Sequence, residues 1–96
     1  MKTALTAVKI EDFSRNNPEW KLQHGKLVRE WVFKDFVAAM LFVNHIAAFA
    51  EAAEHHPDID IRYNRVVLAL VSHEVDGITE NDTAMASRIS AAFAAR

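Results

Sequence analysis

Residues 51–77, EAAEHHPDIDIRYNRVVLALVSHEVDG, hold the end of a helix, two strands and the turns that connect them. Pro57 predicts the end of the helix, because the residue before a proline is disfavoured in the α conformation. The runs 59–63 and 65–73 then predict two strands with a tight connection at Asn64. This stretch therefore predicts a helix followed directly by a β-hairpin.

The remainder of the chain supplies a second hairpin and two more helices. The predicted elements are a short helix that begins near Thr6 and is closed by Asn16-Asn17-Pro18, strands at 20–23 and 26–33, a helix at 36–54, the two strands above and a last helix at 80–95. Asp35 can cap the helix at 36–54, and Thr79 with Asp82 makes a capping box before the last helix. The order α-β-β-α-β-β-α predicts an α+β two-layer sandwich, in which three helices cover one face of a four-stranded antiparallel sheet.

Length and composition indicate one folded domain over residues 1–96. The chain is 51% hydrophobic and contains only two glycines and two prolines, so it has enough apolar side chains to form a core. Its net charge of -2 offers no electrostatic footprint for nucleic acid or anionic lipid. The absence of cysteine excludes disulfides and thiolate metal sites.

Neither a targeting segment nor a membrane span is predicted. Lys9 and the acidic residues after it interrupt the N-terminal region before a long apolar run develops, so we expect no signal peptide. The longest apolar stretch, residues 36–50, contains Asn44 and His45 and is too short to cross a bilayer. We therefore expect a soluble cytoplasmic protein without a membrane partner.

Two predicted elements are more apolar than a monomer requires. The helix at 36–54 carries apolar side chains nearly all round: Phe36, Val37, Met40, Leu41, Phe42, Val43, Ile46 and Phe49. The strand segment 66–71 is apolar on both faces. A helix of this kind is normally buried on more than one side. Other elements of the domain could cover these surfaces, but a short chain has little material for it, which favours a homodimer or homotetramer.

Three of the five histidines, His55, His56 and His73, gather at two chain reversals. Glu51 lies four residues before His55, so the two would share a helix face and the carboxylate could accept a hydrogen bond from the imidazole. This bond would fix the tautomer, and the helix C-terminus would favour the protonated ring. His55 and His56 would diverge by about 100° if both were helical, lining two walls of a pocket.

Several interpretations of these histidines stay open from the residues alone. A histidine on a surface turn is usually a solvated polar side chain, which is the preferred interpretation for His24 and His45. Three histidines with a nearby carboxylate would suit zinc, but no HxxxH or HxH spacing is present. Acid–base chemistry is the third interpretation, because paired imidazoles can donate and accept protons near neutral pH. An elimination of water is a reaction that such a pair would suit.

The chain resembles the pterin-4a-carbinolamine dehydratases at the positions of that family's motif. The matching residues are Glu51, His55-His56-Pro57, Tyr63, His73 and Asp82, together with the segments FKDF at 33–36, YNRV at 63–66 and GIT at 77–79. Animal members of the family carry an aromatic residue at the position of Ile59. Pro-Asp-Ile at this point is more similar to bacterial members.

The resemblance implies a hydro-lyase that acts in tetrahydrobiopterin recycling. Such enzymes convert 4a-hydroxytetrahydropterin, the product of aromatic amino acid hydroxylases, to quinonoid dihydropterin and water without a metal or organic cofactor. By resemblance His55, His56 and His73 would be catalytic, and the residues contacting the pterin would be His55, His56, Pro57, Ser72, His73, Glu74 and Val75. Glu51 and Asp82 would not contact the pterin; they would hold the catalytic histidines in place or cap a helix.

The same resemblance leaves a second role open. Some relatives are coactivators or assembly factors, and in the latter the histidines are lost. This chain keeps all three, which favours an enzyme over a non-catalytic protein-binding module that uses the apolar central helix. In the family, protomers can associate by extending the sheet or by packing central helices into a four-helix bundle.

Overall fold

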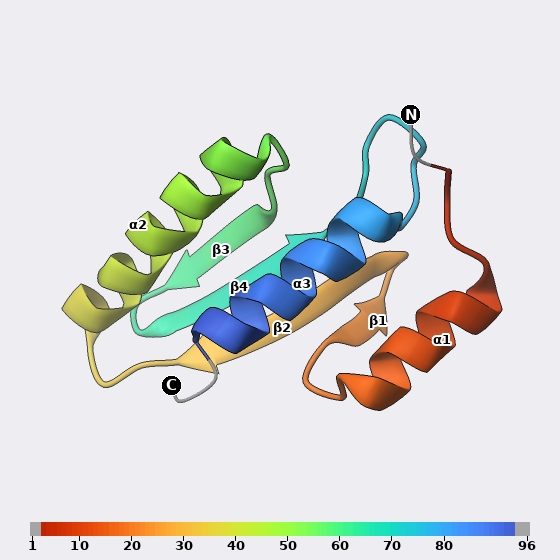
Figure 1. Ribbon diagram of the computed structural model, residues 1–96. Coiled ribbons are helices and arrows are strands. Elements are labelled where there is room, and N and C mark those ends of the chain that lie inside the picture. Colours follow the sequence, from red (N-terminus) through yellow and green to blue (C-terminus); the bar gives the residue numbers. More distant parts are fainter. Residues whose placement is uncertain (1–2, 94–96) are drawn as a thin grey trace.

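The computed structural model describes residues 3–93 as three helices and four strands arranged in two layers (Figure 1). In chain order the elements are α1 (Ala7–Asn16), β1 (Lys21–Gln23), β2 (Lys26–Val32), α2 (Phe36–Ala53), β3 (Asp58–Arg62), β4 (Arg65–Leu70) and α3 (Glu80–Ala92). The predicted element order and the α+β class are confirmed. The predicted end of the last helix, at residue 95, lies outside the described residues.

The four strands form one antiparallel sheet in the order β1-β2-β4-β3. Leu27 of β2 lies opposite Leu70 of β4, and Trp31 lies opposite Val66, so these four side chains share one face. Because neighbouring residues of a strand point to opposite faces, this pairing fixes which face of the sheet is apolar. Helices α2 and α3 lie across that face, while α1 lies beside β1 (Figure 1).

The last strand is shorter than the sequence predicts. We expected it to continue to His73, but β4 ends at Leu70. Ser72 instead pairs with Gly77 in an isolated bridge, and Asp76 between them has a φ of 50°. The chain therefore turns back on itself directly after the strand, and His73 belongs to this turn.

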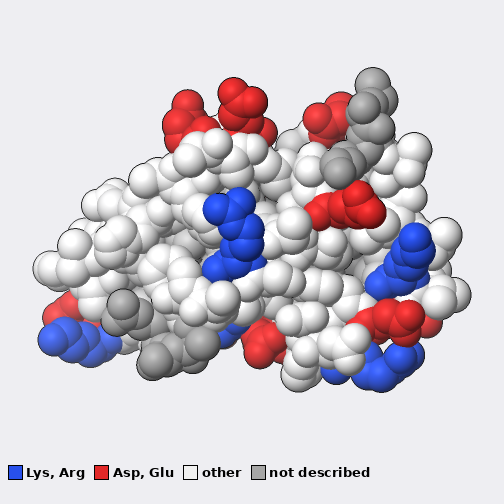
Figure 2. Space-filling view, viewed as in Figure 1, with Lys and Arg blue, Asp and Glu red and all other residues white. Residues whose placement is uncertain are grey.

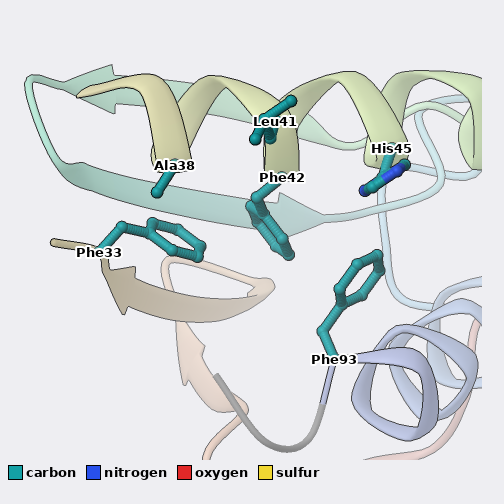
Figure 3. A pocket seen from close by; sticks show the side chains of 6 residues that line it. All are labelled: Phe33, Ala38, Leu41, Phe42, His45 and Phe93. Carbon is teal, nitrogen blue, oxygen red and sulfur yellow. The ribbon is translucent and has the colours of Figure 1, made fainter. Parts of the chain in front are cut away.

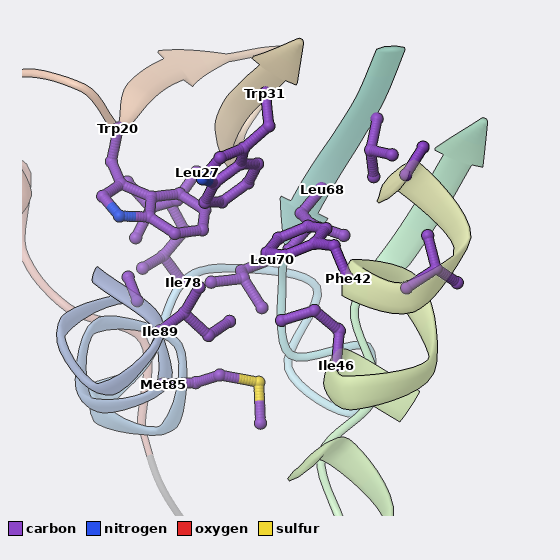
Figure 4. Close-up of a cluster of buried hydrophobic side chains, with 14 residues drawn as sticks. Trp20, Leu27, Trp31, Phe42, Ile46, Leu68, Leu70, Ile78, Met85 and Ile89 are labelled. Atoms are coloured by element: carbon purple, nitrogen blue, oxygen red, sulfur yellow. The ribbon is translucent and has the colours of Figure 1, made fainter. Parts of the chain in front are cut away.

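The core lies between the apolar face of the sheet and the helices α2 and α3 (Figure 4). The Trp20 and Trp31 rings pack edge to face with centroids 5.8 Å apart, and the ring of Phe42 lies 4.7 Å from that of Trp31. Ser90 of α3 accepts hydrogen bonds of 2.9 Å from Trp20 Nε1 and from Arg29 Nη1. Aromatic packing and this hydroxyl together hold α3 on the sheet.

Helix α2 is buried on one side and exposed on the other. Its buried residues are Ala39, Phe42, Val43, Ile46 and Ala50. Val37 and Leu41 on the opposite side remain 65% and 59% exposed, and Phe36 at the start of the helix remains 48% exposed. In Figure 2 the surface over this helix is mostly uncharged, with acidic groups at its upper end and a basic and an acidic group at its lower left end. No element among residues 3–93 covers this apolar side, which we call the outer face of α2.

The length of α2 corrects one expectation. Its 18 residues have a mean hydropathy of 1.6, so length and composition alone would allow it to span a membrane. The apolar stretch 36–50 was expected to be too short to cross a bilayer, but the apolar window reaches Ala53, where the helix ends close to its predicted end at residue 54. One side of α2 packs into the core of the sheet, as a core helix does.

Candidate active site

The C-terminal end of α2 directs the chain toward the two adjacent histidines. Glu54 adopts a left-handed conformation with a φ of 54°, and its N–H donates to the carbonyl of Ala50. The N–H of His55 also donates to that carbonyl, at 3.2 Å. These bonds end the helix just before His55, in the manner of a left-handed helix cap. His55 and His56 therefore lie in a short connection to β3 and not in the helix.

His55 points toward the N-terminus of α3. Its Nε2 lies 2.6 Å from Oδ1 of Asp82, and the two side chains are 14% and 0% exposed. Asp82 is also the third residue of α3 and accepts a hydrogen bond from the backbone N–H of Thr79 at 2.9 Å. Thr79 and Asp82 thus form the predicted capping box, and the same carboxylate holds His55.

His56 points away from His55 and pairs with Glu51. Its Nε2 lies 2.9 Å from Oε1 of Glu51, with side-chain exposures of 62% and 82%. The sequence predicted that Glu51 would bind His55 through the helical spacing of four residues. That prediction is wrong, because the left-handed residue Glu54 interrupts the helix and places His56 over Glu51. The two imidazoles bind different carboxylates, and neither residue is in the helix.

The loop after β4 carries the remaining predicted site residues. His73 and Glu74 are exposed, and Val75 is half-buried. Ser72 is only 2% exposed: its N–H donates to Gly77, its carbonyl accepts from Val75 and Gly77, and its hydroxyl donates to Asp82 at 2.9 Å. Its burial does not agree with the predicted contact between Ser72 and a substrate, because every polar group of this residue already has a partner inside the protein.

These segments meet at one end of the molecule. The end of α2 and the loop after β4 both lie along the upper edge of Figure 1, and α3 begins just below that loop. Asp82 connects them, since it binds His55 from the first segment and Ser72, the neighbour of His73, from the second. Pro57, half-buried, follows the histidine pair. Among residues 3–93 no group of three or more histidine or acidic side chains is arranged to hold a metal ion.

Sequence analysis missed the part that Thr79 plays at this site. We predicted Thr79 only as a helix cap, yet its Oγ1 also lies 2.8 Å from Oγ of Ser72, within the buried group around Asp82. The capping box was a usable signal, because it placed a carboxylate at the helix start. The family resemblance placed Asp82 behind the histidines, but no local spacing indicated that it would bind His55, which is 27 residues away.

A separate cavity lies at the other half of α2 (Figure 3). It has a volume of about 150 Å³ and is lined by Phe33, Ala38, Leu41, Phe42, His45 and Phe93. His45 is exposed, as predicted, and its ring centroid lies 6.1 Å from that of Phe93. None of the predicted site residues lines this cavity.

The architecture is that of a small α+β sandwich that carries two histidine–carboxylate pairs near the end of α2. The sequence model of the family described as pterin 4 alpha carbinolamine dehydratase matches residues 3–92. This chain belongs to that family.

Two relatives illustrate the similarity. One, from Acidobacterium capsulatum, is 55% identical over 87 residues, which cover 91% of this chain and 95% of the relative. Another, from Chloroflexus aurantiacus, is 48% identical over 85 residues, covering 88% and 91%. The names of both assign them provisionally to the pterin-4-alpha-carbinolamine dehydratases.

Two solved structures share the fold. A transcriptional coactivator/pterin dehydratase from Brucella melitensis superposes with a TM-score of 0.85 at 34% identity, covering 93% of this chain and 97% of that one. A pterin dehydratase-like protein described as a RuBisCO assembly factor in the alpha-carboxysome has a TM-score of 0.64 at 24% identity, covering 76% and 87%. The second likeness concerns the fold alone.

Proposed function

We propose that this protein dehydrates 4a-hydroxytetrahydropterin to quinonoid dihydropterin and water, as a single domain in the cytoplasm. The observation that carries the proposal is the pair of adjacent histidines, each bound to its own carboxylate, at the end of α2. Membership in the dehydratase family supports the reaction and the substrate class. The substrate would come from a reaction that hydroxylates an aromatic ring with a tetrahydropterin, such as that of an aromatic amino acid hydroxylase.

The proposed reaction is an acid–base elimination. The lone pair of N5 expels the hydroxyl from C4a while an imidazolium protonates the departing oxygen, so the C4a–O bond breaks and water leaves. One proton is then lost from the ring system to a neutral imidazole, which balances the proton given to the oxygen. His55, His56 and His73 are the residues that we assign to these transfers. Positioned imidazoles contribute about 10²–10⁴-fold to such steps.

The two carboxylates suit the two neighbouring imidazoles to different tasks. Asp82 is fully buried and fixes the ring of His55, whereas the exposed Glu51 leaves His56 in contact with solvent. His56 can therefore exchange protons with water between turnovers, and His55 keeps a constant orientation. We assign the pterin contacts to the segment 55–57 and to His73, Glu74 and Val75, whose loop begins at the buried Ser72.

Stopped-flow absorbance of 4a-hydroxytetrahydropterin decay tests this function. We expect the wild-type protein to accelerate the decay above its rate in buffer, and His56→Ala and His55→Ala to lose about 10²–10⁴-fold of that acceleration. His45→Ala is the matched control, because it removes an exposed imidazole from the same helix region outside the site. A wild-type protein that leaves the buffer rate unchanged would refute the proposal.

A protein-binding role is the second candidate, and the outer face of α2 is the observation that favours it. Phe36, Val37 and Leu41 are three exposed large apolar side chains on one helix, whereas α1 exposes a single one, Val8. Exposed apolar patches of this kind are usual at interfaces. We propose that a second copy of the chain covers the outer face in a homodimer or homotetramer. A coactivator or assembly role for this chain would require the same surface.

A further inference from the structure

The buried group around Asp82 contains more than the pair with His55. Oδ2 of Asp82 accepts hydrogen bonds from Ser72 Oγ and from the backbone N–H of Thr79, both at 2.9 Å, while Oδ1 faces Nε2 of His55. Asp82, Ser72 and Thr79 are 0%, 2% and 1% exposed. Three chain segments thus converge on a single carboxylate that solvent does not reach.

With Asp82 as an ionised carboxylate, which only accepts, the direction of every hydrogen bond in this group follows from the donors available. Backbone N–H groups only donate, and those of Thr79 and Asn81 donate to Asp82 and to Thr79 Oγ1 respectively. Ser72 has one hydroxyl proton, which it gives to Asp82, so the proton between the two hydroxyls, 2.8 Å apart, belongs to Thr79. The donors therefore all point toward the carboxylate. Because Asp82 accepts throughout, Nε2 of His55 has to be the protonated ring nitrogen.

We propose that Ser72 and Thr79 are positioning residues, which orient Asp82 so that His55 is locked in its Nε2–H tautomer. Nδ1 of His55 has no hydrogen-bond partner among residues 3–93 and is then the ring atom left to exchange a proton with substrate. The exchange of a proton with substrate rests on the proposed dehydratase function, whereas the fixed Nε2–H tautomer of His55 does not. A fixed tautomer matters because the wrong one presents a donor where an acceptor is required.

The direction of the bonds makes a sharp prediction for Asp82→Asn. The amide keeps the shape of the carboxylate but has only one oxygen. Thr79 N–H and Ser72 Oγ–H both require an acceptor, so that oxygen takes the place of Oδ2 and preserves the helix cap. The NH₂ group then faces His55 and can only donate. We expect His55 to switch to the Nδ1–H tautomer while the protein stays folded.

Long-range proton–nitrogen NMR spectra of protein with ¹⁵N-labelled histidine report the tautomer without any pterin. The expected result is the Nε2–H form of His55 in the wild type and the Nδ1–H form in Asp82→Asn. Ser72→Ala should make the second tautomer detectable, and Ser72→Thr, which keeps the hydroxyl, should restore a single one. Ser90→Ala is the control, because it removes a hydrogen-bonded hydroxyl from α3 outside this group.

Turnover provides the second readout. We expect kcat to fall by about 10²-fold or more in Asp82→Asn, as a wrong tautomer does in other histidine catalysts. Ser72→Ala should lower kcat about tenfold with KM changed less than about twofold, in the range seen when supporting residues are removed. Ser72→Thr should recover most of this loss, and Ser90→Ala should keep the wild-type kcat.

Three outcomes would overturn all or part of the inference. An Nδ1–H tautomer in the wild type, or an unchanged tautomer in Asp82→Asn, would show that the bonds do not run as proposed. If Ser72→Ala shows a single His55 tautomer and the wild-type kcat, Ser72 does not help to fix the tautomer. If the wild type does not dehydrate the pterin, the proposed function is refuted, but the NMR spectra still show whether Asp82 fixes the tautomer of His55.

Discussion

Single residues at the site differ mainly in how much water surrounds their hydrogen bonds. The bond between His55 and Asp82 is nearly closed to solvent, whereas the bond between His56 and Glu51 is open to it. Exposed pairs contribute little to stability, because water competes for both partners. Buried hydrogen-bonded groups are expensive to disturb, because the remaining partner loses its only acceptor or donor. The two neighbouring histidines are therefore expected to respond differently to loss of their carboxylates.

Glu51→Gln tests this difference on the exposed side. The glutamine oxygen can still accept from His56, so we expect kcat to fall less than about threefold and the urea unfolding midpoint to stay unchanged. Stopped-flow turnover and urea unfolding measure the two quantities. A loss of about 100-fold would contradict this expectation and would give the Glu51 carboxylate a direct part in proton transfer.

At the level of elements, the end of α2 decides where the histidines point. Glu54 adopts the left-handed conformation that glycine normally supplies at a helix end. A residue with a side chain is strained there, yet the turn is what separates His55 from the helix and lets it reach α3. The strained backbone at Glu54 is thus what allows His55 to reach Asp82.

Glu54→Gly should stabilise the protein. Glycine adopts this φ without strain, and part of the gain is offset by its greater freedom in the unfolded chain, so we expect an increase of about 0.5–1 kcal/mol in the free energy of unfolding. Urea unfolding monitored by circular dichroism measures it. Glu54→Ala is the control, since it removes the charge and keeps the strain. Equal stabilisation by both variants would assign the effect to charge and not to the backbone.

At the level of the whole molecule, the outer face of α2 is the largest unexplained feature. A folded chain with 51% hydrophobic residues still leaves Phe36, Val37 and Leu41 exposed on its longest helix. The strand β3 lies at the edge of the sheet, and all of its residues are exposed. Both surfaces border the same side of the molecule in Figure 1 and suit contact with a second copy.

Leu41→Arg should weaken this association. Burial of an unpaired charge in an apolar contact costs about 3 kcal/mol or more, which raises the dissociation constant about 100-fold. Sedimentation equilibrium should show a lower mass than for the wild type at the same concentration. Val8→Arg is the control, because Val8 is an exposed apolar residue on α1, away from α2. An identical mass for the wild type and Leu41→Arg would exclude the outer face as the contact between copies.

The amino-acid sequence by itself determined the order of helices and strands, the caps at Asp35 and Thr79, and the family motif around the histidine pair. These features depend on residues a few positions apart, where proline, capping side chains and alternating apolar residues act locally. Among the described residues most strand and helix boundaries lie within about one residue of their predicted positions, and the main difference is the strand predicted to reach His73, which ends at Leu70 and gives way to a turn.

The tertiary structure alone decided which carboxylate binds which histidine, that Ser72 is buried, and which side of α2 stays exposed. His55 and Asp82 are 27 residues apart, and Ser72 and Asp82 are 10 apart, so no local pattern could pair them. Their contact results from the packing of α3 beside the end of α2 on a common sheet. Local preferences choose the elements of this protein, and long-range packing brings its functional groups together.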